Sequence, residues 1–433
     1  MGVLTMTKYI EETARRTPLV ATADVIVVGA GPAGFSAAIC AARQGASTIL
    51  IEQSGAIGGV ASSGLMSHWT GDTRGGFYEE ILDRSRDAPA MRQTINPEKL
   101  KTVLLEWVVA SGVDLRLYTF ASAPLLDGPR ITGIICESKT GRQAFRGQVI
   151  IDASGDGDIA AQAGVPYTKG RREDGGMQPM TLMFKVAGVD TSRAPFPGGF
   201  EEAAPVPAGE LQALGRQHLP SPAGHVLLYR STLPGVVTCN MTNVIAVDGT
   251  KAEDLTRAEL LARRQLDPIV DFLRQFAPGF ENCYLIDSAS QIGVRETRHF
   301  HGEYTLTEED ILHARLFDDW VVTKAHFNFD IHNLQGAGLD EHGAQRTFTQ
   351  SAGYSIPYRC LLPQHVEGLL LAGRNISGTH KAHSNFRVMP ICANMGQAAG
   401  IAAALAARRG ILPRHLPVSE IQAVLREQGV SPE

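Results

Sequence analysis

One stretch near the start of the chain, residues 24–52, constrains the fold more than any other. An apolar run begins at Val25 and leads into Gly29-Ala-Gly-Pro-Ala-Gly34, and after an alanine-rich segment a second apolar run ends at Glu52. Runs that are apolar throughout are typical of parallel strands whose sheet is covered by helices on both faces. The pattern predicts a right-handed βαβ unit with its helix over residues 32–44.

The glycines at the turn of this unit form a G-x-G-x-x-G motif. Gly29 permits a tight turn, Gly31 lets backbone N–H groups approach a pyrophosphate, and Gly34 allows the helix to pack closely on the sheet. The phosphates would then meet the positive end of the helix. Glu52 ends the next strand, where its carboxylate can accept hydrogen bonds from a ribose diol. The unit therefore predicts a dinucleotide site, with NAD and FAD both open at this point.

Later segments favour FAD. Gly58 and Gly59 follow Glu52 closely, residues 149–158 form an apolar strand that runs into a small-residue turn, and residues 371–374 are followed by Met395-Gly-Gln-Ala-Ala-Gly400. We expect a helix to begin at this last segment, where its dipole would stabilise a reduced, anionic flavin. No second glycine motif follows a strand, so we expect no nicotinamide domain. We expect non-covalent FAD, although His68 is a candidate for a covalent link.

The predicted fold class is α/β: a Rossmann-like FAD-binding domain, with a parallel sheet and a β-meander, plus an inserted α+β substrate domain. Strands are expected at 113–120, 130–137 and 143–151, and helices at 97–111, 252–276 and 395–407. A Gly/Pro-rich stretch at 194–207 interrupts the pattern. The predicted domains are residues 1–185 and 351–433 for the FAD-binding domain and 186–350 for the substrate domain.

Composition excludes several classes of partner. The 433 residues carry 40 basic and 45 acidic side chains, a net charge of -5, which gives no reason to expect nucleic acid or an anionic membrane. The six cysteines show no CxxC spacing, so reduced thiols in a cytoplasmic protein are expected. We expect no apolar run that approaches the roughly 20 residues needed to cross a bilayer, and Arg15-Arg16 is not interpreted as an export signal. Composition leaves the oligomeric state open.

These motifs together resemble those of the FAD-dependent oxidoreductase family that is related to the succinate dehydrogenase and fumarate reductase flavoproteins, within the glutathione-reductase-like fold. The resemblance spans residues 22–407. It is strongest at 24–34, 149–158, 292–298, 356–363 and 372–400. The resemblance implies a glutathione-reductase-like fold and a bound FAD. Asn385 and Phe386 depart from the family pattern, which has a small pair before the arginine, so the resemblance does not imply a substrate.

Basic and titratable side chains crowd the last third of the chain. Guanidinium groups clamp carboxylates at two points, and imidazoles move protons near neutral pH, so this density predicts an anionic substrate or a developing enolate. As an alternative to a role in the reaction site, Arg298 is expected to tie loops together through backbone carbonyls. Arg359 is expected to form a structural ion pair. No metal site is expected from His326, Asp330 and His332. The candidate catalytic residues are His383, His380, Arg387, Arg295 and His332. For Arg295, a structural role in tying loops together has equal weight.

The predicted function is an FAD-dependent dehydrogenase or reductase that moves hydride between flavin N5 and a small polar, anionic metabolite. An electron-transfer partner, a quinone or oxygen would reoxidise the flavin. The alternatives are a flavin-dependent monooxygenase fed by a separate reductase, and a non-catalytic or RNA-modification FAD protein. The expected FAD contacts are Gly29, Gly31, Pro32, Ala33, Gly34, Glu52, Gln53, Gly58, Gly59, Ser63, Ala121, Ala153, Ser154, Gly155, Asp158, Gly373, Arg374, Gly396, Ala398 and Ala399.

Overall fold

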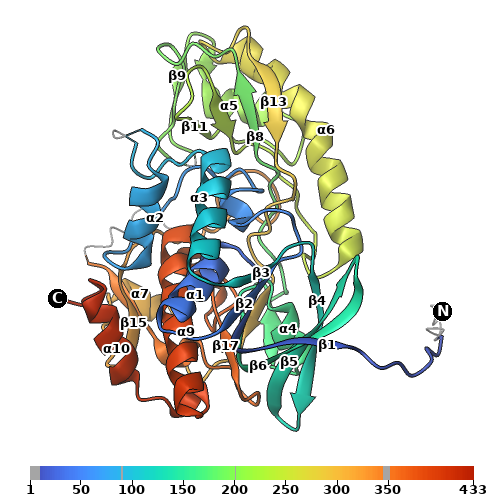
Figure 1. Ribbon diagram of the computed structural model, residues 1–433. Coiled ribbons are helices and arrows are strands. Elements are labelled where there is room, and N and C mark those ends of the chain that lie inside the picture. Colours follow the sequence, from blue (N-terminus) through green and yellow to red (C-terminus); the bar gives the residue numbers. More distant parts are fainter. Residues whose placement is uncertain (1–9, 89–90, 200, 345–351) are drawn as a thin grey trace.

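The computed structural model describes residues 10–88, 91–199, 201–344 and 352–433. The predicted domain boundary at residue 350 lies outside these ranges. In Figure 1 a layered α/β body occupies the lower half, and a smaller sheet flanked by one long helix lies above it. The first and last parts of the chain build the lower body, and the middle part builds the upper one.

A mixed sheet forms the centre of the lower body. Within the described residues it has seven strands in the order β3-β2-β1-β6-β5-β4, with β17 paired to β6. The α/β fold class is confirmed. The strands are β1 (Leu19–Val28), β2 (Thr48–Ile51), β3 (Asp114–Arg116), β4 (Phe120–Asp127), β5 (Arg130–Ser138), β6 (Gly141–Asp152) and β17 (Leu369–Leu371).

The long strand β6 joins the parallel part of this sheet to the meander. It pairs in parallel with β1 along most of its length, while its first half pairs antiparallel with β5. Its last three residues, Ile150–Asp152, pair in parallel with β17. The meander was expected, but the single strand predicted at 113–120 is wrong: β3 ends at Arg116, and Phe120 begins the separate strand β4. The carboxyl ends of β1, β6 and β17 therefore meet at one edge.

Two helices rich in small residues pack on this sheet, α1 (Pro32–Arg43) and α9 (Met389–Arg409). A Cβ on Gly396 would lie 2.0 Å from the Ala33 carbonyl oxygen, and one on Gly400 would lie 2.2 Å from that of Ala37. Both glycines are thus required for close contact of the two backbones. The predicted start of this helix near residue 395 is wrong, because α9 begins six residues earlier, at Met389.

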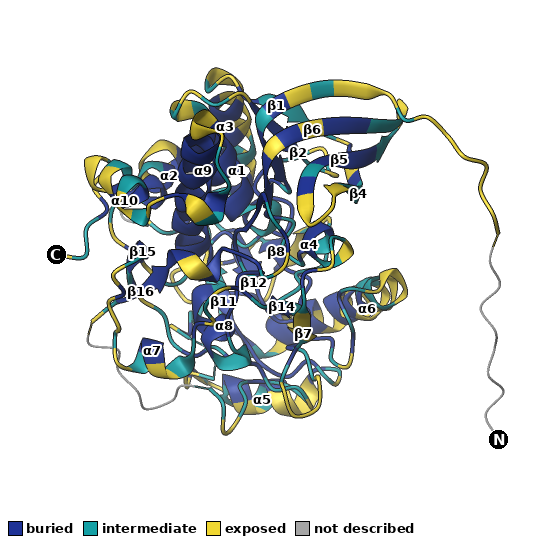
Figure 2. Cartoon of the chain, turned by 90° about the horizontal axis from the view of Figure 1, so that it is seen from below, coloured by how far each residue is buried: buried dark blue, intermediate teal, exposed yellow. Residues whose placement is uncertain are grey.

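Helix α9 also corrects the expectation about apolar runs. Among the described residues it is the one helix long and apolar enough to cross a membrane, with a mean hydropathy of 1.2 over its apolar window. That window is wholly buried inside the protein, which is typical of a central core helix. Figure 2 shows α9 and α1 as buried ribbons in the interior, whereas residues 10–18, which precede β1, are mostly exposed and extend away from the body.

A second hydrophobic core lies in the upper body. It is built mainly from residues 180–289 and includes the predicted helix α6 (Ala252–Phe276). Residues 300–329 instead contribute side chains to the larger hydrophobic core of the lower body. The upper sheet consists of β11 (Leu228–Arg230), β12 (Val237–Cys239), β8 (Phe184–Ala187) and β13 (Tyr284–Ser288), in that spatial order. The predicted division at residues 186 and 350 stays a prediction.

The remaining helices and strands connect or flank these two bodies. They are α2 (Phe77–Ser85), α3 (Pro97–Ala110), α4 (Asp158–Gln162), β7 (Tyr167–Lys169), β9 (Pro205–Val206), β10 (Gly209–Glu210), α5 (Leu211–His218), β14 (Arg298–Phe300), α7 (Glu308–Leu312), β15 (Trp320–Ala325), β16 (Tyr354–Pro357), α8 (His380–Phe386) and α10 (Val418–Glu427).

Candidate active site

A cavity of about 1760 Å³ opens at the edge where β1, β6 and β17 end. Its wall includes Val28 from β1, Ala153 directly after β6 and Ala372 directly after β17. Ligands of open parallel sheets bind outside the carboxyl ends of the strands, so this position is the expected one. Residues of the upper body, such as Tyr229 and Asn240, complete the wall.

The glycine motif lies at one end of this cavity, and its glycines play different roles. Gly29 has φ +88°, and a Cβ there would lie 2.6 Å from the Ala153 carbonyl oxygen. A Cβ on Gly34 would lie 1.8 Å from the carbonyl oxygen of Gly29. A Cβ on Gly31 would meet nothing within 4 Å, so it would project into open space beside the start of α1. These are the three roles that a dinucleotide-binding turn requires.

Glu52 is held rigidly beside this turn. One carboxylate oxygen accepts the Ala30 N–H at 2.8 Å, and the other accepts the Ser54 N–H at 2.7 Å. The side chain also lines the cavity. Because a carboxylate has about four acceptor sites, Glu52 can accept further hydrogen bonds from a ribose diol.

Most of the expected FAD contacts lie in the cavity wall. Those that line it are Gly29, Gly31, Pro32, Ala33, Glu52, Gln53, Gly59, Ala121, Ala153, Ser154, Gly155, Asp158, Gly373 and Arg374.

The other six expected contacts lie outside the lining among the described residues: Gly34, Gly58, Ser63, Gly396, Ala398 and Ala399. Gly34 and Gly396 serve backbone packing, and a Cβ on Gly58 would lie 2.6 Å from Ser62 Oγ. The carbonyl of Ser63 accepts the Ser290 N–H. Contact of these six residues with FAD stays a prediction.

The far end of the cavity carries a charged cluster centred on Asp330. Arg387 Nη2 donates to Asp330 Oδ2 at 3.0 Å, and His332 Nε2 lies 3.3 Å from the same oxygen. Burial alone would raise the pKa of the Asp330 carboxyl, but His332, Arg387 and Arg295 hold it below its usual value. Burial, together with the charge of Arg295, lowers the pKa of His332 to about 4. At neutral pH this cluster therefore holds an ionised aspartate and a neutral imidazole.

Arg295 lies in the same wall and has the structural role considered from the sequence, while a catalytic role stays a prediction. Its Nη1 donates to the Pro179 carbonyl and to Thr181 Oγ1, each at 2.7 Å, which ties two loops together. The side chain also lines the cavity. Burial and the neighbouring Arg387 lower its pKa to about 10, which still leaves it charged at neutral pH.

A pair of aromatic rings, which sequence reasoning did not place together, faces this cluster. The rings of His68 and Tyr229 stack with centroids 5.2 Å apart and an angle of 18° between their planes. His68 Nδ1 also lies 3.2 Å from Thr94 Oγ1, and burial lowers the pKa of His68. Asn240 Nδ2 donates to the Tyr229 hydroxyl at 3.5 Å, while Asn240 Oδ1 is buried without a partner among the described residues. No local motif marks these residues.

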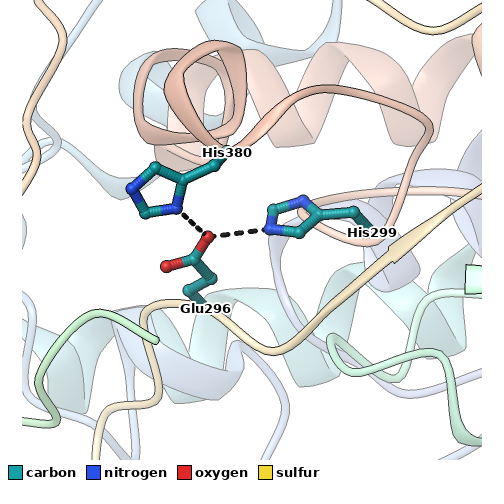
Figure 3. Close-up of side chains that lie close together, drawn as sticks. All are labelled: Glu296, His299 and His380. Atoms are coloured by element: carbon teal, nitrogen blue, oxygen red, sulfur yellow. Dashed lines mark hydrogen bonds and ion pairs between the residues drawn. The ribbon is translucent and has the colours of Figure 1, made fainter. Parts of the chain in front are cut away.

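His380 and His383 lie behind the wall, outside the lining among the described residues. His380 Nδ1 and His299 Nε2 both contact Glu296 Oε1, as Figure 3 shows. The buried ring of His383 packs edge-on against that of His299, with centroids 4.7 Å apart. A catalytic role for either residue stays a prediction, and the geometry favours Arg295, His332 and Arg387 for substrate contact.

The other two basic residues considered have structural partners. Arg298 Nη1 donates to the Asp156 carbonyl at 2.8 Å and to Asp158 Oδ1 at 2.7 Å, so it ties loops. Arg359 pairs with Asp319, with Nε and Oδ2 2.9 Å apart, so the expected structural ion pair is confirmed.

Comparison with known proteins decides the family. Residues 24–425 match the family described as FAD dependent oxidoreductase. The chain belongs to this family. It shares 39% identity over 108 residues with a fumarate reductase (cytochrome) of Shewanella frigidimarina, covering 22% of this chain and 18% of that protein. It shares 29% identity over 164 residues with digeranylgeranylglycerophospholipid reductase 2 of Methanopyrus kandleri, covering 34% and 41% of the two proteins.

The match to these curated relatives thus spans about a fifth to two fifths of their length. Among solved structures, a geranylgeranyl bacteriochlorophyll reductase-like protein of Thermoplasma acidophilum is similar in fold. The TM-score is 0.50 at 14% identity, and the alignment covers 94% of this chain and 84% of that one. The likeness confirms the Rossmann-like fold of this FAD-dependent oxidoreductase.

The cavity fits the FAD that the family binds. Gly31 leaves room for a pyrophosphate, Glu52 is placed for the ribose, and the uncapped start of α9 contributes Val388 and Met389 to the wall. A helix N-terminus stabilises negative charge, so this end suits a reduced flavin ring. Non-covalent binding stays a prediction, because His68 lies in the same wall. Thr119 and Met66 also line the cavity without a recognisable sequence signal.

Proposed function

We propose that this FAD-dependent oxidoreductase is a dehydrogenase or reductase that transfers hydride between the flavin and a small anionic metabolite, most simply a carboxylate. Bound FAD supplies the two-electron redox chemistry. The side chains at the far end of the cavity bind and orient the metabolite. The observation that carries the proposal is the pair of arginines, Arg295 and Arg387, in the wall of the cavity that begins at the glycine motif.

The charges around Asp330 support an anionic ligand. Asp330 balances one of the two guanidinium groups, and His332 is neutral, so this cluster keeps one excess positive charge. Arg387 Nε is buried and has no hydrogen-bond partner among the described residues. A buried charge without a counter-ion costs several kcal/mol, and a bound carboxylate offsets that cost. Arg295 and Arg387 would supply this contact with charge-assisted hydrogen bonds.

His332 is the group best placed to move a proton. Its imidazole is neutral near pH 7, so it can accept a proton from a substrate hydroxyl or C–H. The imidazolium formed would donate a charge-assisted hydrogen bond to Asp330, whose Oδ2 lies 3.3 Å from His332 Nε2. Asp330 thereby orients the ring and stabilises its charged form. Tyr229 also carries a titratable hydroxyl in the wall, but burial raises its pKa to about 12, so it acts as a hydrogen-bond donor.

Anaerobic mixing tests the proposal. The yellow holoenzyme is mixed without oxygen with a panel of hydroxy acids and dicarboxylates, and with the corresponding amides and sugars as neutral controls. We expect at least one carboxylate to bleach the flavin absorbance, while its amide does not. If every compound fails, and turnover instead requires oxygen and an external flavin reductase, the enzyme is a monooxygenase and the proposal is wrong.

A further inference from the structure

A compact group of ionisable side chains, Glu296, His299 and His380, lies outside the cavity. Glu296 Oε1 is 2.7 Å from His299 Nε2 and 2.6 Å from His380 Nδ1. One potential ligand atom from each residue lies within 4.8 Å of the other two. In Figure 3 both imidazoles point at the same carboxylate oxygen. Three donor atoms thus converge on one small volume.

The group is buried and rigidly held. Glu296 is fully buried, His299 nearly so, and the side chain of His380 is 14% exposed. Glu296 lies two residues before β14, which holds His299, and His380 is the first residue of α8, which Thr379 caps. The second oxygen of Glu296 accepts the Gln178 N–H at 3.0 Å. These contacts hold the three side chains in place.

The ligand types match those of divalent transition metals. Two imidazole nitrogens and one carboxylate oxygen are one of the protein ligand sets of catalytic zinc sites, in which water or substrate takes the fourth position. Zn–N and Zn–O distances near 2.0–2.2 Å require the donor atoms to separate slightly from their present spacing. His299 Nδ1 has no hydrogen-bond partner among the described residues, so it can carry the ring proton while Nε2 binds a metal.

We propose that Glu296, His299 and His380 form a binding site for a divalent transition metal ion of the Zn²⁺ class. The ion joins the segment of Arg295 and Glu296 to the start of α8, whose end is followed by Arg387. Gln178 extends the connection, since its side-chain oxygen accepts the His332 N–H at 3.2 Å. The ion thus fixes the spacing of the two arginines and has no contact with the substrate. This inference is independent of the substrate proposed above.

Metal content of the holoenzyme tests the site. The full chain, purified without a histidine tag, is incubated with excess Zn²⁺, passed over a desalting column and analysed by inductively coupled plasma mass spectrometry. We expect roughly one zinc per chain and a thermal midpoint that falls after removal of the metal with a strong chelator. A zinc content near zero, with a midpoint that neither chelator nor Zn²⁺ changes, overturns the proposal. The three side chains would then form a hydrogen-bonded cluster only.

Two variants and one control locate the ion. His380→Gln removes the least buried ligand, so we expect zinc affinity to fall about 100-fold or more while FAD content is retained. His301→Gln, on the same segment as His299 but outside the group, should bind zinc as the wild type does. Equal zinc affinity in His380→Gln and wild type overturns the assignment. If His380→Gln does not fold, Glu296→Gln is measured in its place, and the wild-type stoichiometry still decides.

Discussion

The two ends of the cavity are built in different ways. At the glycine end, Gly29, Gly31 and Gly34 are neighbours in sequence and act through the backbone of one turn. At the far end, Arg295, Asp330 and Arg387 come from distant segments and meet only in the folded chain. The first end is specified by a local motif and binds a cofactor shared by the family. The second end depends on long-range packing, and there the proposed substrate contacts lie.

The largest expected effect separates cofactor binding from folding. Gly31 has extended backbone with φ -70°, and a Cβ there meets nothing within 4 Å. Gly31→Val should therefore fold normally, but its side chain would occupy the space of the pyrophosphate. We expect FAD affinity to fall about 100-fold, roughly 3 kcal/mol, as measured by flavin titration of the apoprotein.

Gly336→Val is the matched control, because it adds the same side chain in a loop outside the cavity lining. It should keep its FAD. Stoichiometric FAD in Gly31→Val would contradict the assignment of the glycine end.

The next effect tests the far end. Arg387→Met leaves the Asp330 carboxylate without its guanidinium partner in a buried site. We expect a loss of about 3 kcal/mol in the free energy of unfolding, and flavin reduction slowed about 100-fold or more with FAD retained. Urea denaturation and stopped-flow absorbance measure the two effects.

Arg359→Met is the control here, since it breaks the more exposed pair with Asp319. We expect a loss of at most about 1 kcal/mol and unchanged flavin reduction. Comparable losses in both variants would show that the Arg387–Asp330 pair has no special role.

The pH dependence of stability provides a second test of the far end, through His332 and through the buried His225, whose Nε2 lies 3.1 Å from the Asn240 carbonyl oxygen. Burial lowers the pKa of His332 to about 4 and that of His225 to about 3. Below the ordinary histidine pKa near 6.5 the unfolded chain takes up protons that the folded chain does not. Stability contributed by these residues is therefore lost as pH falls from about 6.5 towards 4. The slope is about 1.4 kcal/mol per pH unit for each histidine.

Urea denaturation at several pH values measures this slope. His225→Gln should show a smaller slope than the wild type between pH 6 and pH 4.5. An identical slope in the two proteins would mean that His225 is protonated in the folded state.

The smallest effect concerns His383, which the sequence suggested for substrate contact. The ring is buried against His299 and Phe386, outside the cavity lining. We expect His383→Gln to change flavin reduction less than about threefold while it lowers stability by about 1–3 kcal/mol. Stopped-flow reduction and thermal unfolding give the two values. A 100-fold slower reduction in a stable, FAD-containing variant would restore the catalytic interpretation.

The sequence predicts the glycine end well because its signals are periodic and local. The βαβ unit, the meander and α6 lie close to where their apolar patterns place them. It also named Arg295, His332 and Arg387, from the density of basic residues alone, and these residues line the cavity. Gly396, Ala398 and Ala399 lie outside the lining among the described residues, and their contact with FAD stays a prediction. Small residues allow helix packing and close cofactor approach by the same steric mechanism.

The rest of the far end has no local signature. His68 and Tyr229 stack although they lie 161 positions apart in the sequence, and Asn240 is buried by packing of the upper body. His380 and His383 share the short helix α8 with residues that face the core, and sequence alone does not reveal which face turns to the cavity. Residues of this kind can be assigned to the cavity wall only from the structure, in which the upper and lower bodies both contribute to that wall.

The most direct test of the central claim, that the far end holds an anion, is a binding titration. A carboxylate that reduces the flavin, or an unreactive analogue of it, is titrated into the oxidised holoenzyme alongside its neutral amide, and the perturbation of the flavin spectrum is followed. We predict that the carboxylate binds at least about tenfold more tightly than the amide, a difference of about 1.4 kcal/mol, and that Arg387→Met abolishes the difference. Equal affinity for acid and amide in the wild type would contradict the account.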